Sequence, residues 1–125
     1  MDIRGRTKQR HRLRRRRHAR IKKKIRGTAG RPRLVVFRSL RHLEGQLVDD
    51  DRGVTLLGVS TLAGTNGDAG ERSGKVADAY LAGRTLAEKA VAADVGEIVF
   101  DRGGYPYHGR VRAFAEGARD GGLRF

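Results

Sequence analysis

Apolar residues are sparse at the start of the chain and then recur in short runs with turns between them. Residues 34–37 form a β-branched and aromatic run that predicts a strand, and two further strands are predicted over 43–48 and 54–61. A turn at 38–41 separates the first two strands, and an acidic loop ending in glycine at 49–53 separates the next two. The three strands are therefore expected to form an antiparallel meander.

The pattern changes to helical spacing in the second half of the chain. After a glycine-rich loop at 64–70, apolar or small residues recur at three- and four-residue intervals over 76–91, which predicts a helix. Residues 97–100 form a short buried strand, expected to run parallel to an earlier strand because it follows a helical crossover. A last helix is predicted over 111–118. This order indicates an α/β fold: a mixed sheet with a three-stranded antiparallel meander plus a parallel strand, covered by helices.

Residues 8–26 contain neither glycine nor proline, and their Arg and Lys residues are adequate helix formers. Leu13, Ile21 and Ile25 fall on one broad side of a helical wheel, whereas the four arginines at 14–17 surround the axis. Like charges four residues apart repel each other in a helix. We expect this segment to be mobile when free, and helical or extended once phosphates neutralise it.

The charge of the chain is concentrated in this N-terminal segment. Of 28 Lys and Arg residues, sixteen lie in residues 1–33 against one acid, Asp2, so that segment carries +15 while residues 34–125 carry −1. Such a block needs a polyanion, and nucleic acid is the expected partner because each neutralised phosphate releases a counterion. We therefore divide the chain into a basic arm, 1–30, expected to bind nucleic acid, and a globular domain, 31–125. The arm residues expected to contact nucleic acid are Arg10, Arg12, Arg14, Arg15, Arg16, Arg17, Arg20, Lys22, Lys23, Lys24 and Arg26.

Composition excludes several other classes of protein. The absence of cysteine excludes disulfides and thiolate metal sites, and no apolar run approaches the length of a membrane span. No apolar segment follows the basic N-terminus, as a secretory signal would require. An alternative interpretation is that the arm is a targeting peptide or a solvated tail. A cytoplasmic protein without cofactor, metal or membrane partner is the expectation.

A second constellation occupies residues 101–110, where a predicted strand leads into a helix. Glycines there allow close approach of a ligand, Tyr and His can stack on unpaired bases, and Arg can hold phosphate. The alternative is an ordinary turn in which Tyr105 and Tyr107 shield the edge of the core. The candidate contacts are Arg102, Gly103, Gly104, Tyr105, Tyr107, His108, Gly109 and Arg110.

A third, weaker cluster lies on the first strand and its turn, within residues 31–42. Its basic residues adjoin the root of the arm, although Arg38 and His42 could equally be surface residues, and Phe37 is expected in the core. The candidate contacts are Arg31, Arg33, Arg38, Ser39 and His42.

Catalytic interpretations find little support in the residues. Asp49, Asp50 and Asp51 could join Asp101 in a metal cluster, but consecutive acids before a glycine are far more often a solvated hairpin loop. His108 lacks a suitably placed nucleophile, and no phosphate-binding loop or dinucleotide motif is present. We expect no enzymatic activity and no small-molecule substrate, while a metal-dependent nuclease stays open as a hypothesis.

Several motifs resemble those of the bacterial L18 family of large-subunit ribosomal proteins. Arg-Pro-Arg-Leu at 31–34, Val-Phe-Arg-Ser at 36–39 and the following His42 are similar to its first half. Phe-Asp-Arg-Gly-Gly-Tyr at 100–105 and Tyr-His-Gly-Arg-Val at 107–111 are similar to its second half, and the likeness covers 31–125.

This resemblance implies a ribonuclease H-like mixed sheet without that fold's chemistry. It further implies a structural constituent of the large ribosomal subunit that binds 5S rRNA and helps attach it to large-subunit rRNA in the central protuberance. Neighbouring ribosomal proteins of the central protuberance would be further partners.

Three positions depart from the family pattern. Glu44 stands where the family usually has an aromatic residue: near RNA it would repel phosphate, and it should be exposed if that aromatic packs. Arg124 replaces a usual acid, and the 64–74 connection is richer in glycine and less basic.

Overall fold

Four strands form one sheet in the order β3-β2-β1-β4. The computed structural model describes residues 3–65 and 67–125, with the side chains of residues 3–6 and 22–24 outside that description. Neighbouring strands are antiparallel from β1 to β3, and β4 pairs in parallel with β1, so the predicted meander and parallel strand are confirmed. The strands are β1 Arg33–Arg38, β2 Leu43–Asp49, β3 Val54–Ser60 and β4 Val99–Asp101.

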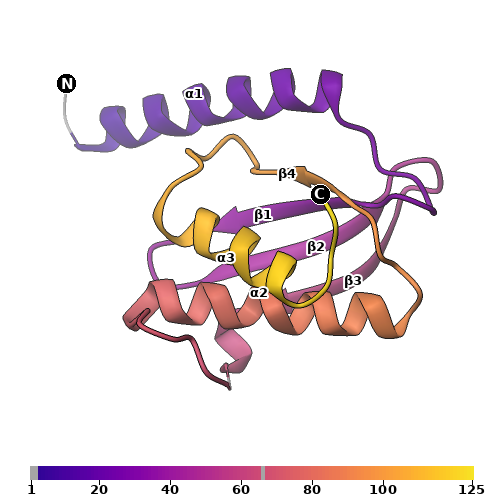
Figure 1. Cartoon of the computed structure of the whole chain (residues 1–125). Helices are drawn as coiled ribbons and strands as arrows, with labels where there is room; N and C mark the ends of the chain where they lie inside the picture. The colour runs from indigo at the N-terminus through magenta and orange to yellow at the C-terminus, as the bar shows by residue number, and fades with distance from the viewer. Residues whose placement is uncertain (1–2, 66) are drawn as a thin grey trace.

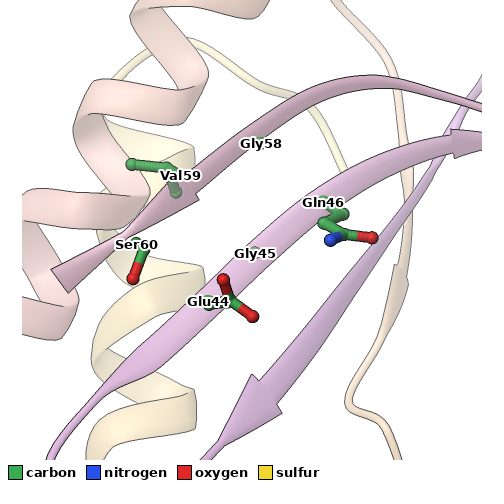
Figure 2. A pocket seen from close by; sticks show the side chains of 6 residues that line it. All are labelled: Glu44, Gly45, Gln46, Gly58, Val59 and Ser60. Carbon is green, nitrogen blue, oxygen red and sulfur yellow. The ribbon is translucent and has the colours of Figure 1, made fainter. Parts of the chain in front are cut away.

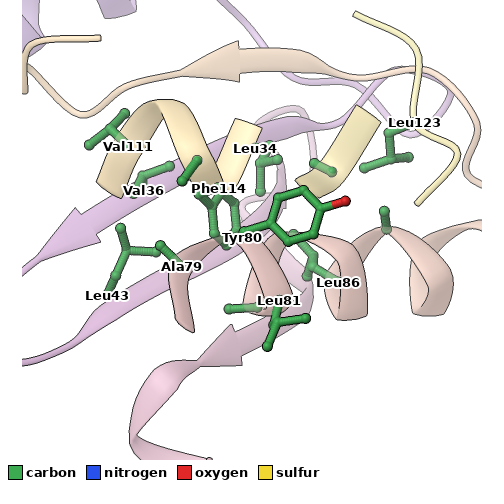
Figure 3. Close-up of a cluster of buried hydrophobic side chains, with 14 of the residues drawn as sticks. Leu34, Val36, Leu43, Ala79, Tyr80, Leu81, Leu86, Val111, Phe114 and Leu123 are labelled. Atoms are coloured by element: carbon green, nitrogen blue, oxygen red, sulfur yellow. The ribbon is translucent and has the colours of Figure 1, made fainter. Parts of the chain in front are cut away.

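Two helices cover one face of this sheet (Figure 1). They are α2, Gly74–Ala92, and α3, Gly109–Asp120, and a short 3-10 turn, Thr61–Ala63, follows β3. Leu34 and Val36 of β1 point into the resulting core, where the ring of Phe114 from α3 is fully buried (Figure 3). Gly45 of β2 lies directly beneath that ring, since a Cβ there would overlap it. The predicted α/β architecture is therefore present.

Close contact between α2 and α3 depends on two glycines. A Cβ added at Gly83 would overlap the carbonyl oxygen of Phe114, and one added at Gly117 would overlap the carbonyl oxygen of Tyr80. Both glycines are buried in their helices despite the low helix propensity of this residue. Backbone proximity therefore explains why glycine occupies both positions.

The N-terminal segment forms a helix, α1, Ile3–Lys24, which runs past β4 and the loop after it (Figure 1). Arg14, His18, Ile21 and Ile25 are half-buried and recur at helical spacing, so they form the side of the segment that faces the body. Leu13, expected on the same side, is 42% exposed. The helical prediction is confirmed, and the mobility expected in solution stays a prediction.

The second face of the sheet lies opposite α2 and α3. Side chains alternate along β1, so Phe37 faces away from the core that holds Val36, and it is 43% exposed. This placement corrects the expectation that Phe37 belongs to the core. On the neighbouring strand Glu44 points to the same side as Phe37, because the two residues are paired in the sheet register.

Candidate nucleic-acid interface

Asp101, the last residue of β4, joins α1 to the body of the protein. Its carboxylate is fully buried, and Oδ2 accepts hydrogen bonds from Nε2 of His18 at 2.8 Å and from Nη1 of Arg33 at 2.7 Å. Oδ1 accepts a third bond from the backbone N–H of Gly103 at 2.8 Å. Because a carboxylate only accepts hydrogen bonds, His18 presents its Nε2–H to this acid.

Arg33 is oriented inward, although its type and position suggested an RNA contact. Its side chain is 8% exposed and makes a two-pronged bond to Asp50, with Nε to Oδ2 and Nη2 to Oδ1 each at 3.0 Å. Burial alone would lower the pKa of Arg33, but the hydrogen bonds and charges of Asp50 and Asp101 raise it overall. The structure therefore gives Arg33 a role inside the protein, between β1, β4 and the 49–53 loop.

The glycines after β4 allow α1 to approach the body. Gly104 has a φ of 81°, and a Cβ there would overlap the carbonyl oxygen of Arg14. Gly103 also has positive φ and lies against the carbonyl oxygen of Val36. Both glycines are buried, so the close approach predicted for this loop occurs with the protein's own backbone.

Tyr105 is 7% exposed and shields the edge of the core, which was the alternative reading of this residue. Its hydroxyl accepts a bond from the backbone N–H of Arg38 and donates to the carbonyl oxygen of Arg38, each at 3.1 Å. The guanidinium carbons of Arg14 and Arg38 lie 5.0 Å and 5.2 Å from its ring centroid. Tyr105 thus holds two arginines beside each other, one from α1 and one from β1.

Most of the predicted contacts of the arm are on the surface of α1. Three of these predicted contacts, Lys22, Lys23 and Lys24, have side chains outside the described part of the structure. Arg26 follows the helix and pairs with Asp51 at 2.7 Å in an exposed ion pair. Among the helix residues whose side chains are described, the exposed arginines are Arg10, Arg12, Arg15, Arg16, Arg17 and Arg20.

Arg38 and Arg110 form a pair of cations close to Tyr105. Burial lowers the pKa of Arg110, and the positive charge of Arg38 lowers it further. Nη1 of Arg110 is buried without a hydrogen-bond partner, and within the described residues neither guanidinium pairs with a carboxylate. Two adjacent arginines without an acid, one with an unsatisfied N–H, provide the donors that a phosphate group requires.

The turn after β1 is shaped by hydrogen bonds between its own residues. The Ser39 hydroxyl accepts a bond from the backbone N–H of His42 at 3.1 Å, and the Ser39 backbone N–H donates to the carbonyl oxygen of His42 at 2.8 Å. Nδ1 of His42 lies 3.2 Å from Oγ1 of Thr61. Ser39 and its neighbours remain exposed in this arrangement, and so does Arg31 at the other end of the strand.

The remaining candidates lie in the loop that leads into α3. Nη1 of Arg102 donates to the carbonyl oxygen of Tyr105 at 2.9 Å. Tyr107 is 44% exposed and its hydroxyl accepts a bond from Nη1 of Arg119 at 3.2 Å. His108, the N-cap of α3, and Gly109, its first residue, are exposed. The segment thus contains a buried part, 103–105, and an accessible part, 106–109, and the half-buried Arg110 follows in α3.

Reasoning from the sequence missed the anchoring role of His18. The residue lies among arginines in the arm, and its partner Asp101 follows 83 positions later. No local pattern marks such a pair, and only the approach of α1 to the end of β4 reveals it.

The acidic residues do not form a metal site in the part of the chain that the structure describes, where no group of three or more His, Asp or Glu side chains could hold an ion. Asp50 and Asp101 are instead linked through Arg33. Oδ1 of Asp49 accepts bonds from the backbone N–H groups of Asp51 and Arg52, so these acids lie at a hairpin as predicted. The expectation that they are solvated is wrong for Asp49, which is fully buried. Among the described helices, none is both long and apolar enough to cross a membrane.

Comparison with known proteins decides the family. Residues 8–125 match the family model of ribosomal L18 from archaea, bacteria, mitochondria and chloroplasts. The chain belongs to the ribosomal L18 family. This confirms the resemblance seen in the motifs, and it extends the likeness into the arm. Members of this family are ribosomal proteins, a structural kind of protein, and belong to the ribosome with its rRNA.

Relatives from distant bacteria support this assignment. A large ribosomal subunit protein uL18 of Pelotomaculum thermopropionicum is 54% identical over 116 residues, which cover 93% of this chain and 95% of the relative. The uL18 proteins of Bacillus cytotoxicus and Gluconobacter oxydans are each 50% identical and cover 90% of this chain, with 92% and 95% of the relatives' own lengths. A role as a structural constituent of the large ribosomal subunit follows.

Proposed function

We propose that this L18-family protein binds 5S rRNA and helps attach it to large-subunit rRNA in the central protuberance. The observation that carries the proposal is the pair Arg38 and Arg110, two cations without a carboxylate partner beside Tyr105. A phosphate placed between them would supply the missing acceptor and relieve the repulsion of the two charges.

The arm contributes a second basic surface beside this pair. Arg14 lies against the same tyrosine ring as Arg38, so the two surfaces meet at Tyr105. One RNA can therefore contact both the exposed side of α1 and the Arg38–Arg110 pair. We infer that the arm, 1–30, supplies affinity and that the globular domain, 31–125, selects the RNA by its shape and unpaired bases.

The proposed contact residues are the accessible members of the predicted set. Phosphate contacts are assigned to arginines because they can bind bidentately, and stacking to exposed rings. Arg33, Gly103, Gly104 and Tyr105 are not retained as RNA contacts, because each is buried within the protein. In the body the retained residues are Arg31, Arg38, Ser39, His42, Arg102, Tyr107, His108, Gly109 and Arg110.

The test compares 5S rRNA with an unrelated RNA of equal length at one moderate salt concentration. The full chain is expected to prefer 5S rRNA. In Arg38→Gln/Arg110→Gln that preference should decrease, whereas Arg15→Gln/Arg16→Gln on the exposed side of α1 should weaken binding of both RNAs alike. Equal affinity of the unchanged protein for the two RNAs would contradict the proposal and favour a general polyanion binder.

A further inference from the structure

A hollow of about 320 Å³ lies on the sheet face opposite α2 and α3, near the ends of the antiparallel strands. Phe37 of β1 faces Glu44 of β2, and Glu44 in turn faces Ser60 of β3. Leu62, 73% exposed, and His42 line the same hollow. Two of its side chains are therefore apolar and accessible, and its only acid is Glu44.

The hollow extends along the sheet beyond Glu44. A shallower depression continues over β2 and β3, where Gln46 stands beside the bare backbone of Gly58 (Figure 2). Because Gly58 adds no side chain, the surface next to Glu44 is flat and open. A planar group can therefore lie over the strands with its edge towards the carboxylate.

Glu44 is exposed, and in the part of the chain whose side chains are described no cation pairs with it. It lies in the same hollow as Arg38, one of the two cations assigned to phosphate. A carboxylate beside RNA repels phosphate and cannot donate a hydrogen bond when ionised. It can favour RNA by accepting hydrogen bonds from a ribose 2′-hydroxyl or from the edge of a base, and of these only a base edge offers two donors side by side.

The two oxygens of a carboxylate match one base better than the others. Guanine presents N1–H and an N2 amino hydrogen side by side on its Watson–Crick edge, whereas adenine and cytosine present only one amino group there and uracil one imino group. Those edges are accessible in unpaired RNA, whose bases can also stack on aromatic side chains. A parallel pair of bonds to a charged acceptor is the stronger and more specific arrangement.

We propose that this hollow binds an unpaired guanine base of RNA. Glu44 accepts hydrogen bonds from guanine N1–H and N2–H, the ring of Phe37 packs against the base, and Arg38 holds a phosphate of the same strand. The inference rests on the proposed function. Continuity with the Arg38–Arg110 pair favours a nucleotide over a protein side chain as the occupant, because the hollow and the phosphate contacts share Arg38.

The experiment uses the full chain and three labelled pentanucleotides, in which a central guanosine, inosine or adenosine is flanked by uridines. Inosine keeps N1–H and O6 of guanine and lacks only the N2 amino group. Binding is followed by fluorescence anisotropy at one moderate salt concentration. The unchanged protein is expected to bind the guanosine oligonucleotide about tenfold more tightly than the other two.

Glu44→Gln is the informative variant. A glutamine amide can pair with N1–H and O6, which guanosine and inosine share, so the ratio of their affinities should fall to within about twofold of one. Glu71→Gln removes the same charge from another exposed position and should keep the tenfold ratio. This control separates base recognition from a general gain in RNA affinity on losing an acid.

Two results would overturn the inference: equal binding of guanosine and inosine by the unchanged protein, or a preference that persists in Glu44→Gln. A hollow that serves a neighbouring ribosomal protein would give the first of these. The affinity for 5S rRNA over an unrelated RNA is measured on the same samples. Intact 5S selectivity without a guanosine preference removes the inference alone, whereas loss of 5S selectivity removes the proposed function.

Discussion

Nε2 of His18 lies 2.8 Å from Oδ2 of Asp101, and this contact connects the basic helix α1 to the end of the shortest strand. The same oxygen accepts a bond from Arg33, so one buried carboxylate joins α1, β1 and β4. The arm is thus positioned by the body through a small number of specific contacts, although most of its arginines whose side chains are described are exposed.

Replacing Asp101 by asparagine should destabilise the whole protein. Arg33 would lose the fully buried one of its two carboxylate partners and keep only Asp50, while its guanidinium remains desolvated. Breaking a buried pair in this way typically costs about 3 kcal/mol of the free energy of unfolding. Urea denaturation followed by circular dichroism measures this loss. Asp51→Asn serves as the control, because its pair with Arg26 is exposed and should leave the urea midpoint nearly unchanged.

Gly104→Ala should release α1 from the body. The added Cβ overlaps the carbonyl oxygen of Arg14, so the helix must move away. Amide hydrogen exchange over residues 10–21 should then become faster by about tenfold, because a detached helix of this composition is marginal. Gly109→Ala is the matched control, because Gly109 also has positive φ but an added Cβ there would meet nothing within 4 Å. Similar exchange in both variants would contradict the docking of α1 against Gly104.

The two cations at Tyr105, Arg38 and Arg110, should contribute to the salt dependence of the affinity for RNA. If Arg38 and Arg110 each neutralise a phosphate, replacing either by glutamine should reduce the slope of log affinity against log salt by about 1. Titrations of 5S rRNA at several salt concentrations measure the slope. Arg124→Gln, near the opposite end of the sheet, should leave it unchanged; an equal change in that variant would show a general charge effect.

Acid should weaken the ion pair between Arg72, which lies just before α2, and Glu116 of helix α3. Hydrogen bonding to Arg72 lowers the pKa of Glu116, so the pair stabilises the fold above the ordinary glutamate value of 4.5. That contribution is lost as pH falls from about 4.5 through the lowered pKa of the folded state. Melting temperatures measured from pH 7 to pH 3 should therefore fall less steeply in Glu116→Gln than in the unchanged protein; parallel curves would contradict the assignment.

Gly117→Ala should destabilise the protein although alanine is the better helix former. Its Cβ would overlap the carbonyl oxygen of Tyr80 and force α2 and α3 apart, at a net cost of about 2 kcal/mol of unfolding free energy. Urea denaturation measures the cost. Gly30→Ala, in open space, should change the midpoint little, and an equally stable Gly117→Ala would show that the helices adjust freely.

The elements themselves could be predicted because they depend on local patterns. Alternation along 43–48 and helical spacing over 76–91 lie within single segments, and the strands and helices were found close to those positions. Bounds shifted by a few residues: the short strand, predicted over 97–100, begins at Val99 and includes Asp101. Pairing with β1 extends that strand, and pairing is a property of the sheet.

The direction in which a charged side chain points could not be predicted in the same way. Arg33 and Arg38 are the two ends of one strand and looked alike in sequence, yet Arg33 is buried against two acids and Arg38 faces another cation. Tyr105 and Tyr107, two positions apart, likewise separate into a buried and an accessible residue. Residues in the same segment thus take different roles according to what the fold places next to them.

The sequence by itself therefore determined the order of elements, the separation of a basic arm from a nearly neutral body, and the class of partner, since all three depend on composition and short-range pattern. Only the tertiary structure decided which basic residues remain available to RNA. Hydrogen bonds such as that of His18 to Asp101 join positions 83 residues apart, and the energy of a buried carboxylate depends on the neighbours that folding brings within hydrogen-bond distance.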